Sequence, residues 1–208
     1  MTARSGQQRF EAKRARLERH AAEEDPRVVL AAAARFLEAR QRSVDEVRRH
    51  LAVARYPAEL IENAVQRLTE LGMLDDRAFG RTWLESRDRA RPRGENALRR
   101  ELALKGLDRE LVAELLADRA AGIDETGEPA PRAGSGVDDD EPVEMRAALA
   151  LLARRGSALA RVLDPRARRQ RAYALLARSG FDPGVCHAAS ARFVTAASDE
   201  DSATDEGD

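Results

Sequence analysis

The chain has 208 residues, enough for one or two compact domains, and its 43% apolar content is ordinary for a globular protein. Aromatic residues make up only 4% and charged residues 35%, so alanine and leucine must form most of the core, which favours packed helices over sheets. The single cysteine excludes an intramolecular disulfide and fits a reducing, cytoplasmic environment, and no apolar run approaches the ~20 residues that span a bilayer.

The formal net charge of −1 conceals an uneven distribution along the chain. Residues 118–144 hold nine acidic and two basic side chains, and residues 197–208 hold six acidic side chains and no basic one. The remaining residues carry 34 basic and 22 acidic side chains, a net charge of +12, and nearly all of the bases are arginine. A compositional bias toward arginine explains part of this excess, but a basic helical body also suits a polyanionic partner.

In chain order, residues 1–25 are polar and charged, and nothing in them demands a core, so we predict a flexible segment, which could form a frayed helix. Two ordered blocks follow, at 26–117 and 145–196. Residues 118–144, rich in Asp, Glu, Gly and Pro, are predicted to form a flexible linker between these blocks. Residues 197–208 are predicted to form a disordered acidic tail.

Helix boundaries are well marked within the blocks. Ser43 opens a capping box at the start of one helix. Pro57 suits the first turn of the next helix, and Gly72 suits its end. These signals recur along both blocks, which predicts three helices in each repeating unit and no strand.

The adjacent pair Asp75-Asp76 allows two interpretations. The pair could act as catalytic carboxylates, or one of the two could accept hydrogen bonds from the free N–H groups at the start of a helix. Adjacent residues on a helix point about 100° apart, so the two carboxylates cannot readily converge on one substrate atom. The pattern favours a helix cap at the joint between two units.

Three copies of one helical plan account for the two blocks. Shifting the first copy by 51 residues, and the second by a further 74, superposes apolar positions throughout. The aligned sets are Val47, Leu51, Tyr56, Leu60 and Ala64, then Leu98, Leu102, Leu107, Leu111 and Leu115, then Ala172, Leu176, Phe181, Val185 and Ala189. We predict three-helix repeats at 26–74, 75–117 and 145–196. Each repeat is too small to bury much surface alone, so neighbouring repeats must complete its core.

Four stretches carry a resemblance to a known family. They are RQRSVDEVRRHL (40–51), LGMLDDRAFGRTWLESR (71–87), RGENALRRELALKGLD (93–108) and RQRAYALLARSGFD (169–182). Together and in this order they resemble the RecX family, the regulatory proteins of the RecA recombinase, over residues 27–117 and 145–190. The resemblance implies an all-α fold, an elongated array of three tandem three-helix repeats.

The resemblance also implies a function. A protein of this kind binds the RecA protein and the RecA–DNA filament, and it suppresses filament growth and recombinase activity in DNA recombination, repair and the SOS response. It is expected to be a cytoplasmic monomer without catalytic activity or cofactor, and single-stranded DNA is a further possible partner. The alternative is a nucleic-acid-binding module of helix-turn-helix character that acts without RecA, and a purely structural scaffold comes third.

The motifs of common enzymes are absent from the sequence. There is no phosphate-binding G-x-x-x-x-G-K-[ST] loop, no H-E-x-x-H pair and no nucleophile with an evident base. The three histidines, His20, His50 and His187, are scattered, so we expect no metal site. Trp83 could stack on a nucleic-acid base, although packing in the core explains it better.

Basic residues are the candidates for contact with RecA or DNA. The densest run lies between Arg87 and Lys105, and a solvated helix face is its default explanation, but under the family resemblance it is the first choice for filament contact. Arg40, Arg87 and Arg155 end the first helix of each repeat, where they could offset the helix dipole or form a row that binds phosphates. The full candidate set is Arg40, Arg42, Arg48, Arg87, Arg91, Arg93, Arg99, Arg100, Lys105 and Arg155.

Overall fold

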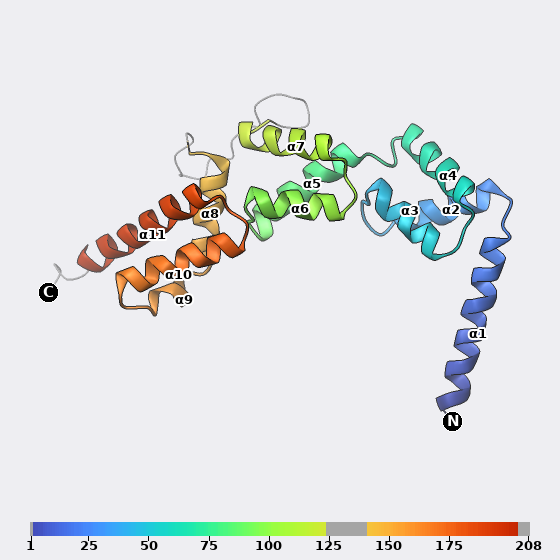
Figure 1. Ribbon diagram of the computed structural model, residues 1–208, viewed down its shortest axis with the longest axis horizontal. Helices are drawn as coiled ribbons and strands as arrows, with labels where there is room; N and C mark the ends of the chain where they lie inside the picture. The colour runs from blue at the N-terminus through green and yellow to red at the C-terminus, as the bar shows by residue number, and fades with distance from the viewer. Residues whose placement is uncertain (1, 124–140, 204–208) are drawn as a thin grey trace. The chain divides into compact units, whose positions relative to one another are not determined.

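The computed structural model describes residues 2–123 and 141–203, and all regular structure in these two ranges is helical (Figure 1). The helices are α1 (Thr2–Ala21), α2 (Pro26–Leu37), α3 (Val44–Val53), α4 (Ala58–Glu70), α5 (Asp76–Ala90), α6 (Glu95–Leu104), α7 (Arg109–Ala121), α8 (Val143–Arg154), α9 (Gly156–Ala160), α10 (Pro165–Arg178) and α11 (Pro183–Ala203). The predicted all-α class, built of tandem three-helix repeats, is confirmed.

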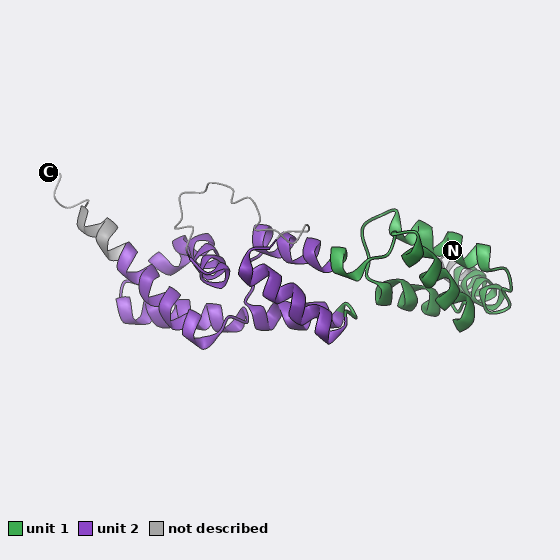
Figure 2. Cartoon of the chain, turned by 90° about the horizontal axis from the view of Figure 1, so that it is seen from above, with its two compact units in different colours: residues 1–79, 105–107 green, residues 80–104, 108–208 purple. Residues whose placement is uncertain are grey.

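The chain divides into two compact units (Figure 2). Unit 1 comprises Met1–Phe79 and Lys105–Leu107, and unit 2 comprises Gly80–Leu104 and Asp108–Asp208. Unit 1 therefore contains α1 to α4 and the first turn of α5, and unit 2 contains the rest of α5 and the helices from α6 to α11.

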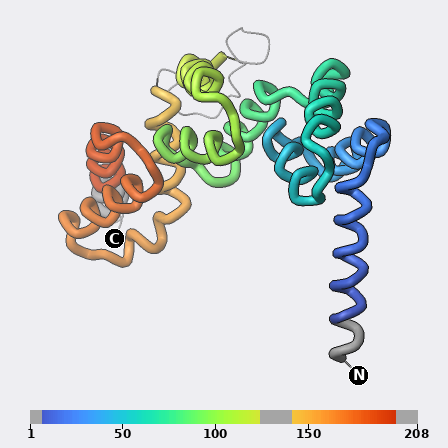
Figure 3. The backbone as a smooth tube through the Cα atoms, turned by 45° about the vertical axis from the view of Figure 1, so that its right-hand side comes forward, coloured from blue at the N-terminus to red at the C-terminus, as the bar shows by residue number. Residues whose placement is uncertain are grey.

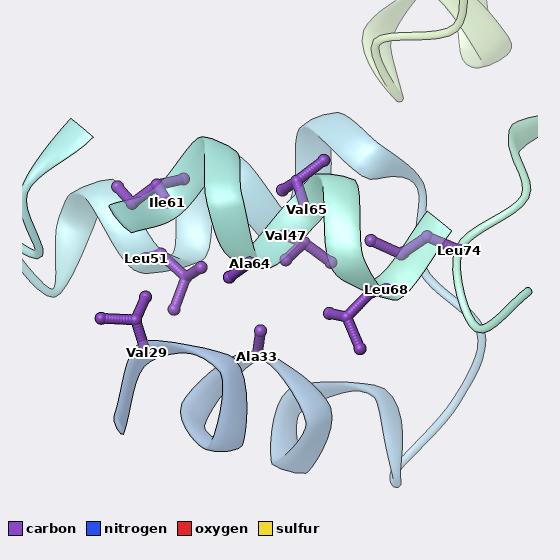
Figure 4. Packing of buried hydrophobic residues seen from close by; sticks show 9 residues of the cluster. All are labelled: Val29, Ala33, Val47, Leu51, Ile61, Ala64, Val65, Leu68 and Leu74. Atoms are coloured by element: carbon purple, nitrogen blue, oxygen red, sulfur yellow. The ribbon is translucent and has the colours of Figure 1, made fainter. Parts of the chain in front are cut away.

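Small aliphatic side chains form the core of unit 1 (Figure 4). Its buried residues are Val29 and Ala33 from α2, Val47 and Leu51 from α3, Ile61, Ala64, Val65 and Leu68 from α4, and Leu74. Leu51 lies between the facing helices α2 and α4 and is 0% exposed. A fully buried Leu or Val contributes about 1.5–3 kcal/mol, so this core needs no aromatic residue at its centre.

The repeat alignment made from the sequence agrees with the burial pattern. Six of the aligned positions lie on the second helix of each repeat and are all 0% exposed: Val47, Leu51, Leu98, Leu102, Ala172 and Leu176. In unit 2, α8, α10 and α11 pack around a second core that includes the buried cysteine, Cys186. Alanine at positions 172 and 189 lets these helices approach closely.

The two neighbouring aspartates have separate structural roles. The Asp75 carboxylate accepts hydrogen bonds from the backbone N–H groups of Arg77 (2.8 Å) and Ala78 (3.0 Å), so it caps the start of α5 as predicted. Asp76 instead accepts a hydrogen bond from the backbone N–H of Val44, at 2.9 Å, and so caps the start of α3. The capping box at Ser43 is also present.

Burial raises the pKa of Asp76 above its usual 3.8; the Val44 N–H and Arg48 oppose the rise, while the charges of Asp75 and Asp45 add to it. The folded state therefore favours the neutral acid. The stability that this preference contributes is present below the usual pKa and is lost as the pH rises through the folded-state pKa. We expect Asp76→Asn, which keeps the accepting oxygen, to melt at or above the wild-type temperature at neutral pH and at the same temperature in acid.

Thermal melts of both proteins followed by circular dichroism across this pH range check the expectation. A D76N variant that melts well below the wild type at neutral pH would show that the charge strengthens the hydrogen bond by more than its burial costs. Asp76→Ala is the reference for loss of the cap itself, expected at about 0.5–2 kcal/mol.

The same arrangement of a carboxylate and a helix start recurs in unit 2. Glu144, in the first turn of α8, accepts a hydrogen bond from the backbone N–H of Glu95 at 2.8 Å. In the sequence alignment of the repeats, Glu95 corresponds to Val44 and Glu144 corresponds to Asp76. The first helix of one repeat thus caps the second helix of the preceding repeat, twice in the chain.

A second hydrogen bond accompanies each of these caps. The Ser43 hydroxyl donates to the carbonyl oxygen of Lys105 (2.5 Å), and the Gly94 N–H donates to the carbonyl oxygen of Ser179 (3.1 Å). These donors and acceptors are again equivalent positions of the repeat. Because each cap and its companion bond hold the start of a helix to a turn far away in sequence, they fix the order in which the repeats join.

The helix α1 ends against an equivalent turn (Figure 3). His20 Nδ1 lies 3.0 Å from the carbonyl oxygen of Ala54, the position equivalent to Lys105 and Ser179, and its ring stacks on Tyr56 at 4.3 Å between centroids. A carbonyl oxygen can only accept, so Nδ1 carries the hydrogen. His20 therefore donates to the turn of the first repeat the hydrogen bond that the second and third repeats receive from the repeat before them.

The structure contains more helix than the sequence predicted at both ends of the chain. The first 25 residues, predicted to be flexible, include the twenty-residue helix α1. The predicted tail, 197–208, begins inside α11, which continues to Ala203 because neither Gly nor Pro interrupts the Ala-rich run. Residues 204–208 lie outside the described residues.

The predicted linker and the third repeat also differ in detail. The helix α7 continues to Ala121, where Gly122 in the left-handed conformation (φ 69°) ends it, and α8 begins at Val143. Of the predicted linker 118–144, residues 124–140 lie outside the described residues. The five-residue helix α9 was not expected, since it is too short to show a hydrophobic period.

Candidate functional site

Three candidate residues, all in unit 1, are already paired with carboxylates. Lys105 Nζ lies 2.7 Å from Glu46, and Arg40 lies 3.4 Å from the same carboxylate. Burial alone would raise the pKa of Glu46, but Lys105, Arg40 and the Ser43 N–H together lower it. The third, Arg48, makes a two-pronged contact with Glu62, at 2.7 Å and 2.9 Å. The charge of each base is therefore compensated within the protein.

Arg42 contacts an aromatic ring. Its guanidinium lies over the ring of Phe36, 4.2 Å from the ring centroid, and the same ring stacks on His50 at 3.8 Å. Burial, together with the charge of Arg42, lowers the pKa of His50. Arg42 therefore holds an aromatic pair on unit 1 through a cation–π contact.

Arg87, in unit 2, is also held internally. Its Nε donates to Glu101 at 2.6 Å, and its guanidinium lies 4.5 Å from the centroid of Trp83. The indole N–H of Trp83 donates to the same carboxylate at 3.1 Å. The half-buried Trp83 is thus fixed by Glu101 and covered by Arg87, which favours a packing role for it over base stacking.

Arg99 and Arg100 project from the exposed side of α6. Arg99 pairs with Glu95 one turn earlier, and Arg100 donates from Nε to the carbonyl oxygen of Asn96 at 3.0 Å. Neither Arg99 nor Arg100 lines the hollow around the candidates Arg91, Arg93 and Arg155. Exposed pairs such as Arg99 with Glu95 contribute about 0–1 kcal/mol, so a partner can exchange them at little cost.

Four arginines of unit 2 gather around one hollow of about 580 Å³. Arg91 and Arg93 come from the loop after α5, and Arg154 and Arg155 come from the end of α8. The remaining lining residues are Ala90, Pro92, Leu151, Leu175 and Ser179, so no acidic side chain of the described residues lines the hollow. We call Arg91, Arg93, Arg154 and Arg155 the basic cleft.

The arginines of the basic cleft differ in how they are held. Arg154 donates to the carbonyl oxygens of Ala90 and Arg89 (2.6 Å to the latter) at the end of α5, so its position is fixed, and no carboxylate of the described residues pairs with it. Arg93 lies 4.0 Å from Glu101, the outer limit of an ion pair. Within the described ranges, Arg91 and Arg155 have no carboxylate partner.

The structure therefore divides the ten candidates. It brings Arg91, Arg93 and Arg155 together, and it places Arg40, Arg48, Arg87, Arg99 and Lys105 in ion pairs elsewhere. The sequence prediction missed Arg154, although the Arg154-Arg155 pair at the end of an apolar helix was a visible signal. Which of these residues touch a partner stays a prediction.

Chemically, the basic cleft is an anion-binding surface. Guanidinium groups remain charged at any physiological pH and match the geometry of phosphate and carboxylate oxygens. Within residues 2–123 and 141–203, no group of three or more His, Cys, Asp or Glu side chains could hold a metal ion. In the same ranges no helix combines the length and the apolarity that crossing a membrane requires.

Sequence comparison finds relatives that are named regulatory protein RecX. Residues 30–68 match the family model described as the first three-helix domain of RecX, and residues 75–116 match the second. The regulatory protein RecX of Mycolicibacterium vanbaalenii is 34% identical over 131 residues, which cover 59% of this chain and 71% of that protein. The regulatory protein RecX of Pelodictyon phaeoclathratiforme is 39% identical over 84 residues, which cover 40% of this chain and about half (52%) of that protein.

Structural comparison supports the fold. The crystal structure of RecX from Lactobacillus salivarius superposes with a TM-score of 0.63 at 13% identity, over 81% of this chain and 96% of that one. A second RecX crystal structure gives a TM-score of 0.59 at 16% identity, over 77% of this chain and 68% of that one. At these identities the likeness bears on the fold alone.

Proposed function

Because the chain belongs to the RecX family, we propose that it regulates the RecA recombinase by binding and not by catalysis. In this proposal the protein works as a monomer in the bacterial cytoplasm. It binds the RecA–DNA filament through basic helical surfaces and suppresses filament growth, and with it the activity of RecA in recombination, DNA repair and the SOS response.

One observation supports a particular binding surface for this function. The basic cleft collects four guanidinium groups around a hollow that no acidic side chain of the described residues lines, whereas most other candidate bases are neutralised by carboxylates. A concave surface of one charge sign attracts a polyanion and raises its rate of encounter. The phosphate backbone of DNA and acidic side chains of RecA both supply the complementary charge.

The proposal is tested with the wild-type protein and the RecA of the same organism. DNA-dependent ATP hydrolysis by RecA is measured while this protein is titrated in, and we expect hydrolysis to fall as the filament shortens. Unchanged hydrolysis, together with DNA binding that is equally tight with and without RecA, would instead support the helix-turn-helix alternative. A protein that affects neither DNA nor RecA would be a scaffold.

The basic cleft itself is tested by changing Arg91, Arg93 and Arg155 together to Gln. Gln keeps helix propensity and hydrogen-bonding capacity while it removes the charge. Arg154 stays, because it holds the end of α5. We expect the concentration that half-inhibits RecA to rise about tenfold, since three fewer anion contacts weaken a salt-dependent complex by at least this much.

A matched control removes the same charge elsewhere. Arg14, Arg27 and Arg67 form exposed ion pairs on unit 1, and changing these three to Gln should leave inhibition within about twofold of wild type. Thermal melting verifies that both triple variants fold. If the cleft variant melts like the wild type and still inhibits RecA fully, the working surface lies elsewhere, and Arg40 and Arg100 are tested next.

A further inference from the structure

The groove between α10 and α11 of unit 2 is a second basic hollow, which the candidate set did not include. It has a volume of about 600 Å³ and is lined by Arg166, Arg169, Gln170, Tyr173, His187 and Ser190. None of these is acidic. Both helices belong to the third repeat, so the groove lies within one packed body around the core that contains Cys186.

The helix α10 has an unusual charge for its position. It carries five arginines and no acidic residue, and its first turn holds no acid, whereas α3 begins with Asp45 and Glu46 and α6 begins with Glu95. A cation near a helix N-terminus is opposed by the helix dipole, at about 0.3–1 kcal/mol for each charge. The acid of the third repeat stands just before the helix instead, since the N-cap Asp164 accepts hydrogen bonds from the backbone N–H groups of Arg166 and Ala167, both at 3.1 Å. Asp164 therefore offsets part of this cost at the helix start, while the five arginines of α10 meet no acidic residue within the helix itself.

An aromatic pair occupies the middle of the groove. The rings of Tyr173 and His187 lie 4.8 Å apart between centroids at an interplanar angle of 56°, one from each helix. In the first repeat, the positions aligned with these two residues hold Arg48 and Glu62, which bridge the same two helices by an ion pair. The third repeat has thus replaced a charged bridge with two rings.

The positions along α10 arrange these groups in a row. Arg166, Arg169 and Tyr173 are three and four residues apart, so they share one face of the helix over about 10 Å. Arg166 and Arg169 are exposed, Tyr173 is half-buried, and no carboxylate of the described residues pairs with either arginine. Two free cations therefore precede a ring on one surface. Phosphates recognised by arginine and a base stacked on an aromatic ring are how proteins hold single-stranded nucleic acid.

We propose that the groove between α10 and α11 binds single-stranded DNA, with one base against Tyr173 and neighbouring phosphates at Arg166 and Arg169. This inference deepens the proposed function and rests on it for the identity of the strand. An acidic protein segment would satisfy the arginines but would leave the paired rings without a role. The rings therefore favour the nucleic acid.

The experiment uses the full chain and a fluorescein-labelled oligothymidylate, with binding measured by fluorescence anisotropy in the absence of RecA. Tyr173→Leu keeps an apolar side chain against the core but removes the ring, and it should weaken binding about tenfold or more. Tyr173→Phe keeps the ring and should bind like the wild type. Arg166→Gln with Arg169→Gln should make the dependence of log affinity on log salt shallower by about 1.4.

Thermal melting of each variant, and RecA inhibition by the wild type, complete the design. Oligonucleotide binding that is undetectable in the wild type, or equal in Y173L and Y173F, overturns the groove proposal even if the protein inhibits RecA. Variants that bind the oligonucleotide normally but lose the filament overturn it too, since the groove would then hold a protein. If Y173L alone loses oligonucleotide binding while the wild type has no effect on RecA, the groove proposal is upheld and the RecA proposal is refuted.

Discussion

Replacing Gly94 with alanine is expected to destabilise unit 2 by about 3 kcal/mol or more, because the added methyl group has no space. A Cβ at this position would overlap the backbone nitrogen of Phe181 and the carbonyl group of Gly180. These are backbone atoms, which cannot turn away as a side chain can. Two hydrogen bonds depend on the same approach, from Gly94 N–H to Ser179 (3.1 Å) and from Asn96 N–H to Gly180 (3.2 Å).

Two other glycines provide matched controls for this variant. A Cβ at Gly156 would meet nothing within 4 Å, so Gly156→Ala should be neutral or stabilise by up to about 1 kcal/mol. Gly72 is equally open but has a φ of 67°, so Gly72→Ala should cost about 1–2 kcal/mol from conformation alone. Urea unfolding of the three variants separates contact from conformation. If Gly94→Ala unfolds like Gly156→Ala, the close approach between α6 and the turn before α11 does not contribute to stability.

Much of the fold could be predicted because its signals are local. The capping box at Ser43 and the cap at Asp75 each act within three residues, so the sequence shows them directly. The offsets of 51 and 74 predicted buried positions in all three repeats. One turn breaks the pattern, since Arg55 holds a left-handed conformation (φ 67°) where the equivalent residues are Gly106 and Gly180.

The contacts that join the repeats could not be predicted, because their partners lie far apart in sequence. Glu144 is 49 residues from Glu95, and Arg154 is 64 residues from Ala90. A glutamate early in a helix indicates only a favourable dipole interaction with its own helix. That Glu144 caps a different helix depends on packing, which no short pattern encodes.

The candidate site also combines features that are local in the sequence with contacts between residues far apart in it. Charge density along the sequence found Arg91 and Arg93, which do line the basic cleft. Density could not reveal that Lys105 is neutralised by Glu46, 59 residues away, or that Arg48 is neutralised by Glu62 on the next helix. The groove beside Tyr173 was missed because a single tyrosine in an arginine-rich helix has no distinct period.

Replacing Arg119 with alanine is expected to cost about 2–4 kcal/mol of the stability of unit 2, less than a fully buried ion pair because its partners are partly exposed. Its side chain is only 9% exposed. It donates two parallel hydrogen bonds to Asp88, at 2.8 Å and 2.9 Å, and a third to Glu144 at 3.2 Å. Burial alone would lower the pKa of Arg119, but these two carboxylates raise it, so they stabilise the charged form.

The loss should exceed that of a single pair, because Arg119 also positions the carboxylate that caps α6. Without it, Asp88 and Glu144 repel each other, and Glu144 no longer has a fixed place from which to accept the Glu95 N–H. Urea unfolding at neutral pH measures the loss. The deficit should shrink in acid, where protonation removes the repulsion in the variant and the ion pair in the wild type.

Arg89→Ala is the matched control, since Arg89 pairs with Glu85 at 3.6 Å while both side chains are more than two-thirds exposed. Screening by water should keep its effect below about 0.5 kcal/mol. Adding Asp88→Asn to Arg119→Ala should restore part of the loss, because one of the two repelling charges disappears. Equal unfolding of the Arg119 and Arg89 variants would mean that the buried charge network is not what holds α7 to α5 and α8.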